Sequence, residues 1–275
     1  MPWTSLHGFE NPQEIVLSPD GDKLAFIGLT FPLNGEPTFS YYHLFVGNLD
    51  ETRFHPLTDI HQRIEPIFDP SWSPDGKWVA VAKTHPHNGV GIARSDGSGV
   101  TWLTEETVPE FPHPPDSLNL QISSVTPVWF RDSSHLLFLV ALHGEAASAL
   151  YRVKPDGTEL VKLQDRDVYA PTISPDGTRL AFASYDDENQ RNSGIIVITD
   201  LNAQSPREIV RMEHPDNQKM LIRDLAWSPD GTRLAFAANP KGNMDLFVVN
   251  ADGTDLRDIT GWPGDEIAPR WRPRP

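Results

Sequence analysis

WSPDGTRLAFA, residues 227–237, is a segment that the chain repeats. Close copies are LSPDGDKLAFI, WSPDGKWVAVA and ISPDGTRLAFA, which begin at Leu17, Trp72 and Ile173. A degenerate copy begins at Trp129 and a truncated one at Trp271. The copies recur every 44 to 57 residues, a period at which each unit is one supersecondary structure.

A second phrase follows each copy, as in DLFVVNADGTDLRDIT at residues 245–260. The Pro, Asp and Gly of the first phrase suit successive positions of a tight turn, and the second phrase carries another Asp-Gly turn. The apolar runs between turns have the length of strands and are too short for helices. Each unit therefore predicts four short strands, and five full units cover about residues 10–60, 61–120, 121–167, 168–220 and 221–262.

Proline lies two residues before the Trp or Ile of four copies, at Pro70, Pro127, Pro171 and Pro269. Because proline has no N–H to donate, it is tolerated only at a strand edge that needs no partner. The inner strands of four-stranded units stacked around a channel have such an edge. The pattern predicts an all-β propeller in which the aligned tryptophans pack between blades, at Trp72, Trp129, Trp227 and Trp271.

The W-S-P-D-G-x-x-L-A-F phrase, followed by L-[FY]-V-x-x-x-D-G and L-T, resembles the repeat of TolB-like β-propellers. It also resembles the propeller domains of prolyl oligopeptidase and dipeptidyl-peptidase relatives. The resemblance covers residues 10–275 and implies one propeller domain over residues 1–275. TolB binds protein partners of the cell envelope, so the resemblance implies protein binding. The G-x-S-x-G elbow of the peptidase relatives is absent from the sequence.

The number of blades depends on the last residues. Five complete units favour five blades of four antiparallel strands, with residues 263–275 closing the ring and Glu266 to Trp271 as a spare inner strand. The alternative is six blades, the last of them incomplete. We expect a monomer, and the spare strand makes a strand-mediated dimer the alternative.

Composition excludes several classes of function. The 275 residues include 23 Lys and Arg against 38 Asp and Glu, a net charge of −15 that disfavours nucleic-acid backbones and anionic membranes. Without cysteine there are no disulfides, catalytic thiolates or zinc–thiolate sites. With no apolar run long enough to span a membrane and no secretory signal, we expect a soluble cytoplasmic protein, or a periplasmic or secreted one if a leader was removed.

The variable connections all emerge at one end of the predicted blades, opposite the two repeated turns, and we expect function there. They are residues 28–41, 59–66, 83–91, 104–124, 141–148, 164–170, 184–194, 211–222, 238–244 and 260–266. Histidines are concentrated in these loops. His85 and His87 have a spacing that suits a divalent metal ion, with His61 as a further candidate and Glu65 or Asp187 as the carboxylate ligand. The alternative is that these side chains are simply exposed polar groups.

Three further loop features are candidates for partner binding. Residues 185–191 are acidic and suit a cation or a basic peptide end, although acidic runs also occur as solvated surface. The proline-rich residues 109–115 predict a stiff arm that presents Phe111 and His113. Charged and aromatic residues before the inner strands suit a peptide clamp, or alternatively pairing between blades; they are Arg63, Glu65, Tyr169, Arg223 and Asp224.

Two functions from different classes follow. The preferred prediction is a non-catalytic propeller without a cofactor that binds a protein or peptide through its loop-rich face, using His61, Arg63, Glu65, His85, His87, Phe111, His113, His143, Tyr169, Asp187 and Arg223. The alternative is a metal-assisted hydrolase or lyase that acts on a small polar substrate, with a divalent ion held by His85, His87 and His61. A purely structural module is a third interpretation.

Overall fold

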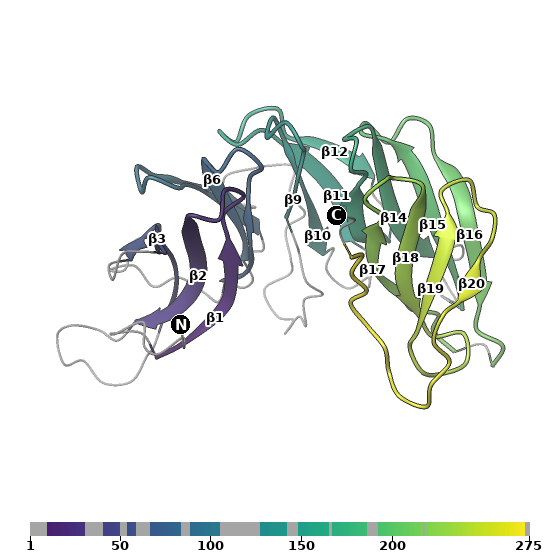
Figure 1. Cartoon of the computed structure of the whole chain (residues 1–275). Helices are drawn as coiled ribbons and strands as arrows, with labels where there is room; N and C mark the ends of the chain where they lie inside the picture. The colour runs from purple at the N-terminus through teal and green to yellow at the C-terminus, as the bar shows by residue number, and fades with distance from the viewer. Residues whose placement is uncertain are drawn as a thin grey trace, which may run out of the picture. The chain divides into compact units, whose positions relative to one another are not determined.

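The computed structural model describes residues 10–30, 41–49, 54–58, 67–83, 89–104, 127–141, 148–164, 167–185, 192–216 and 218–272. These residues form five four-stranded antiparallel sheets, as the repeat predicts (Figure 1). No part of them forms a helix that is long and apolar enough to span a membrane. The chain divides into two compact units, Met1–Glu145 with Arg152–Val161 and Ala146–Tyr151 with Lys162–Pro275.

The first two sheets lie in the first unit. One runs in the order β1-β2-β3-β4 and the other in the order β5-β6-β7-β8. The strands are β1 (Glu10–Leu17), β2 (Lys23–Thr30), β3 (Tyr41–Asn48), β4 (His55–Pro56), β5 (Ile67–Trp72), β6 (Trp78–Lys83), β7 (Gly89–Arg94) and β8 (Val100–Thr104).

The third sheet, in the order β12-β11-β10-β9, contains residues of both units. The fourth and fifth sheets lie in the second unit, in the orders β13-β14-β15-β16 and β17-β18-β19-β20. Their strands are β9 (Val128–Trp129), β10 (Leu136–Ala141), β11 (Ser148–Val153), β12 (Val161–Gln164), β13 (Tyr169–Ile173), β14 (Arg179–Tyr185), β15 (Ser193–Asp200), β16 (Arg207–Glu213), β17 (Ile222–Trp227), β18 (Arg233–Ala238), β19 (Asp245–Asn250) and β20 (Arg257–Asp258).

The hydrophobic core of each unit lies between neighbouring sheets. In the second unit, side chains of the fourth sheet such as Ile196 pack with Leu234 and Phe236 of the fifth. In the first unit, Leu44 and Val79 belong to one cluster formed by the first two sheets. A single four-stranded sheet leaves both faces open to water, so this packing between successive repeats is what buries the apolar faces.

The aligned tryptophans pack between repeats as predicted, and each also donates a hydrogen bond. Trp72, Trp129 and Trp227 are buried, and Trp271 is half-buried. Every one of these indole N–H groups donates to a backbone carbonyl on the inner strand of the preceding repeat, namely Val16, Ser71, Thr172 and Ala226.

The closing strand predicted near the C-terminus is not a strand. Residues 263–272 of the described chain carry no sheet ladder. The backbone N–H of Glu266 donates to the Met244 carbonyl at 2.7 Å, and that of Ala268 donates to the Asp224 carboxylate at 3.1 Å. Pro263 and Pro269 have no N–H to donate. The segment therefore keeps the position of an inner strand beside β17, while its N–H groups bind partners that do not form a sheet.

Candidate functional site

Most of the predicted binding residues lie outside the described part of the chain. They are His61, Arg63, Glu65, His85, His87, Phe111, His113, His143 and Asp187, and their roles stay predictions. The same holds for the divalent ion and for the enzymatic alternative that needs it. Within the described residues there is no group of three metal-ligating side chains. Tyr169 and Arg223 are the predicted binding residues that the structure places.

Tyr169 and Arg223 occupy the same repeat position, just before a β-bulge in an inner strand. The register of β13 shifts between Tyr169 and Thr172, and that of β17 shifts between Arg223 and Ala226. The bulge residue in each case has a positive φ, 47° at Ala170 and 57° at Asp224. A bulge re-aims the side chains next to it, which is why bulges often accompany binding sites.

The bulge recurs through the chain. Positive φ values also occur at Glu14, Asp69 and Ala268, the aligned positions of the first and second repeats and of the C-terminal segment. Where this residue is acidic, its carboxylate can tie one repeat to the next. The Glu14 carboxylate accepts the Asp69 N–H at 2.5 Å, as the Asp224 carboxylate accepts the Ala268 N–H. Burial raises the pKa of Glu14 above its ordinary value.

Tyr169 is held by its own sheet. Its hydroxyl donates to the buried Asp167 carboxylate at 3.4 Å, and its ring packs edge-on against Tyr185 with centroids 5.2 Å apart. The Lys219 ammonium lies 5.8 Å from the centre of the Tyr185 ring. Tyr169 therefore helps to brace the aromatic end of the fourth sheet and presents only part of its surface to solvent.

Arg223 is exposed, and its Nε lies 3.5 Å from the Asp224 carboxylate of the same strand. The sequence suggested that these charges either clamp a peptide or pair between blades. Arg223 does pair with an acid, but the acid lies on its own strand and not on another blade. An exposed ion pair contributes little to stability, and a guanidinium has five N–H donors, so Arg223 keeps donors for a further acceptor. Ile267 occupies the same register position in the C-terminal segment, and it is 51% exposed. Neighbouring inner segments thus present an aromatic, a cationic and an aliphatic side chain at one register position.

The prominent residue that the sequence patterns did not single out is Trp262. It lies in the variable loop 260–266 and is 66% exposed. The sequence does contain a pattern that could have identified Trp262 as a candidate. Trp72, Trp129, Trp227 and Trp271 share one repeat register, and Trp262 does not. A tryptophan outside the core register has no packing role assigned by the repeat.

Hydrogen bonds fix the loop that carries Trp262. Asn243 Nδ2 donates to the carbonyls of Trp262 and Gly264, each at 3.1 Å. The buried Asp245 carboxylate accepts the Gly261 N–H at 3.1 Å. Further bonds join Met244 to Asp265 and Leu246 to Thr260. The loop backbone is therefore held by several hydrogen bonds where the indole is exposed.

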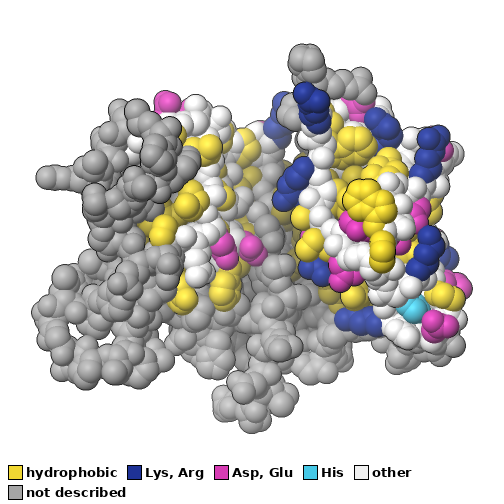
Figure 2. Space-filling model, turned by 60° about the horizontal axis from the view of Figure 1, so that its bottom comes forward, with side chains coloured by type: hydrophobic (Ala, Val, Ile, Leu, Met, Phe, Trp, Pro, Cys, Tyr) yellow, Lys and Arg dark blue, Asp and Glu magenta, His cyan; other side chains and the backbone are white. Residues whose placement is uncertain are grey.

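An ion pair supports the same region. Lys241 Nζ lies 2.9 Å from the Asp258 carboxylate, which joins the β18–β19 loop to β20. The hydrogen bond from Lys241 lowers the pKa of Asp258, and the same bond raises the pKa of Lys241. Figure 2 looks toward this end of the fourth and fifth sheets and shows hydrophobic side chains among basic and acidic ones. The arrangement suits contact with a partner that has both apolar and polar groups.

Comparison with known proteins agrees with this architecture. The model of the TolB beta propeller domain family matches residues 133–274. The Tol-Pal system protein TolB of Thioalkalivibrio sulfidiphilus is 30% identical over 87 residues, which are 32% of this chain and 19% of that protein. The match thus spans about a fifth of the relative's length.

Solved structures show the same fold at low sequence identity. TolB from Acinetobacter baumannii is 16% identical with a TM-score of 0.53, over 87% of this chain and 53% of that one. Porphyromonas gingivalis dipeptidyl peptidase 4 is 14% identical with a TM-score of 0.58, over 94% of this chain and 41% of that one. Both resemblances predicted from the repeat are confirmed. With a family model that covers more than half of its residues, the chain belongs to the TolB β-propeller domain family.

Proposed function

We propose that this propeller is a non-catalytic module that binds a protein or peptide through its loop-rich face, with Trp262 as the anchor. The observation that carries the proposal is an indole 66% exposed on a loop that hydrogen bonds hold in place. Large aromatic side chains are usually at least partly buried in monomers, and tryptophan is enriched among residues that dominate binding energy. A loop backbone that is already held by hydrogen bonds needs little further ordering on binding.

The fifth sheet and the C-terminal segment beside it also carry the polar and aliphatic groups that such an interface uses. Arg223 and Asp265 are exposed charged groups of opposite sign, and Ile267 is an exposed aliphatic side chain. Interfaces combine an apolar centre with a polar rim, so this composition favours a peptide with one apolar residue flanked by polar ones. The related TolB proteins are named as parts of a Tol-Pal system, which supports a protein partner by analogy.

The test begins with a random peptide library displayed on phage and selected against the purified protein. An enriched peptide is synthesised, and its Kd is measured by fluorescence anisotropy. We expect Trp262→Ser to weaken binding about tenfold or more without changing the melting temperature, because the side chain is exposed.

Leu256→Ser is the matched control. Leu256 is 42% exposed and lies beside β20, at the turn end of the fifth sheet. Its substitution should leave the affinity unchanged. Selection that enriches no peptide, or an enriched peptide that binds Trp262→Ser as well as the unchanged protein, overturns the proposal.

A further inference from the structure

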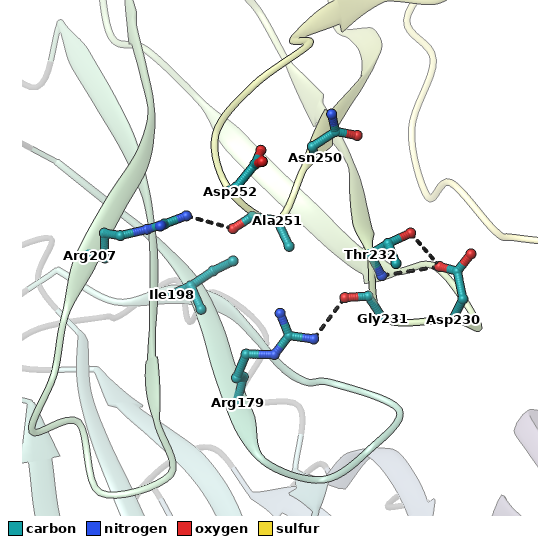
Figure 3. Close-up of a pocket in the computed structure, with 9 residues that line it drawn as sticks. All are labelled: Arg179, Ile198, Arg207, Asp230, Gly231, Thr232, Asn250, Ala251 and Asp252. Carbon is teal, nitrogen blue, oxygen red and sulfur yellow. Dashed lines mark hydrogen bonds between the residues drawn. The ribbon is translucent and has the colours of Figure 1, made fainter.

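A second candidate site lies at the opposite end of the same strands. A cavity of about 640 Å³ opens between the fourth and fifth sheets, beside the repeated turns (Figure 3). Its walls come from the starts of β14 and β16, the end of β15 and the two turns of the fifth sheet at residues 230–232 and 250–252. The volume is within the range of small-ligand pockets.

Two arginines reach this cavity from the fourth sheet, and carbonyl groups of the fifth sheet hold both. Arg179 Nη2 donates to the Gly231 carbonyl at 2.7 Å, and its guanidinium lies 4.6 Å from the centre of the Trp227 ring. Arg207 Nη2 donates to the Ala251 carbonyl at 2.9 Å. A guanidinium has five N–H donors, so each arginine keeps donors for a further acceptor.

The cavity also contains acids that accept hydrogen bonds inside their own turns. The bonds from Thr254, and to a smaller extent the charge of Arg207, lower the pKa of Asp252. One Asp230 oxygen accepts the Ser228 hydroxyl and the Thr232 N–H and hydroxyl. One Asp252 oxygen accepts the N–H and hydroxyl of Thr254. Among the described residues, no carboxylate lies within 4 Å of the Arg207 guanidinium. Arg179 Nη2 does lie 3.8 Å from one Asp176 oxygen. Arg207 is therefore the arginine of this cavity whose guanidinium has no carboxylate of the described residues at ion-pair distance, although its geometry favours a bidentate one.

Besides the arginines and the acids, the cavity has an apolar side chain, Ile198. Ile198 lies between the two arginines in Figure 3, with Arg207 and Arg179 extending past it toward Ala251 and Gly231. We propose that this cavity binds a carboxylate attached to an aliphatic group. Arg207 and Arg179 donate hydrogen bonds to the carboxylate, and the aliphatic group packs on Ile198. The carboxyl end of a peptide and a free aliphatic acid share this chemistry.

The test titrates ¹⁵N-labelled protein with four probes and follows the backbone amide signals. The probes are acetyl-Gly-Ala-Leu with a free carboxylate, the same tripeptide as its C-terminal amide, 3-methylbutanoate and inorganic phosphate. We expect saturable shifts at Gly231 and Ala251 with the tripeptide acid, and binding of the amide weaker by about tenfold or more. Binding of the tripeptide acid alone identifies a peptide end as the source, and equal binding of 3-methylbutanoate identifies a free acid.

Variants separate the site from general charge effects. Arg207→Met should weaken the tripeptide acid about tenfold or more, whereas Arg257→Met, which removes an exposed arginine outside the cavity, should not. Trp262→Ser should also leave this affinity unchanged, so the cavity and the loop-face proposal fail independently. Equal affinity of acid and amide, equal affinity of phosphate and tripeptide acid, or no saturable shift with either carboxylate overturns the proposal.

Discussion

At the scale of single residues, the repeated turn is held by a serine–aspartate pair. The Ser174 hydroxyl donates to the Asp176 carboxylate, which also accepts the Thr178 N–H at 3.0 Å. The Arg179 N–H returns a bond to the Ser174 hydroxyl at 2.9 Å. Equivalent serine–aspartate bonds occur in the first, second and fifth repeats. The sequence phrase is therefore a hydrogen-bonded unit and not only a favourable turn composition.

The Ser174 hydroxyl, together with the Thr178 N–H and hydroxyl, lowers the pKa of Asp176 from 3.8 to about 2. A carboxyl with a lower pKa in the folded state stabilises the protein above its unfolded-state pKa, and this contribution is lost as the pH falls through the folded-state pKa. We expect Asp176→Asn to destabilise the protein at neutral pH. The difference from the unchanged protein should shrink from about pH 4 to about pH 2. Urea unfolding at several pH values measures it, and a difference that stays constant over this window contradicts the assignment.

The indole hydrogen bonds of the aligned tryptophans are a second interaction of single residues that recurs between repeats. Trp129 is buried, and its Nε1 donates to the Ser71 carbonyl at 2.9 Å. Trp129→Phe leaves that carbonyl without its donor and a small void behind, so we expect a loss of about 1–3 kcal/mol in the free energy of unfolding. Trp78→Phe is the control, because Trp78 is half-buried and its indole N–H donates no hydrogen bond among the described residues. Equal losses in the two variants, measured by chemical denaturation, would assign the effect to ring size alone.

At the scale of elements, the second turn of the fifth repeat packs against the fourth repeat. Gly253 has φ +85°, and a Cβ there would lie 2.9 Å from the Ile209 carbonyl oxygen of β16. Gly97 is the equivalent residue of the second repeat, with φ +78° and nothing within 4 Å of a Cβ. The two glycines share the backbone conformation and differ in the contact.

We therefore expect Gly97→Ala to cost about 1 kcal/mol for the left-handed conformation, and Gly253→Ala to cost clearly more because the turn must also move off β16. Thermal unfolding of both variants measures the difference. A smaller loss for Gly253→Ala than for Gly97→Ala would show that this turn does not pack closely on β16.

The C-terminal segment shows what an inner strand requires. Residues 266–271 have the positive φ at Ala268, the proline at Pro269 and the indole bond from Trp271 that mark the inner strands. They nevertheless form no ladder, because a ladder needs a second strand to supply partners along its length. The repeat pattern predicted a spare inner strand over Glu266 to Trp271, and this prediction of its secondary structure was wrong.

At the scale of the whole molecule, the repeat accounts for five four-stranded sheets, and the family match accounts for the propeller class. The functional prediction was less complete. Tyr169 and Arg223 do lie at equivalent positions of neighbouring inner strands, as the repeat register requires. Trp262 was not predicted because the sequence interpretation considered only the four tryptophans that share the repeat register and pack between repeats. The cavity was not predicted because the repeated turns were treated as structural.

The sequence by itself determined the turns, the order of the short strands and the repeat, since these depend on residues close together in the chain. Only the tertiary structure showed that Arg179 reaches Gly231 and that Arg207 reaches Ala251. Likewise, only the tertiary structure showed that Asn243 and Asp245 hold a loop that leaves Trp262 in solvent. Contacts between separate repeats depend on how whole sheets pack, and a pattern of neighbouring residues does not specify which side chains that packing brings together.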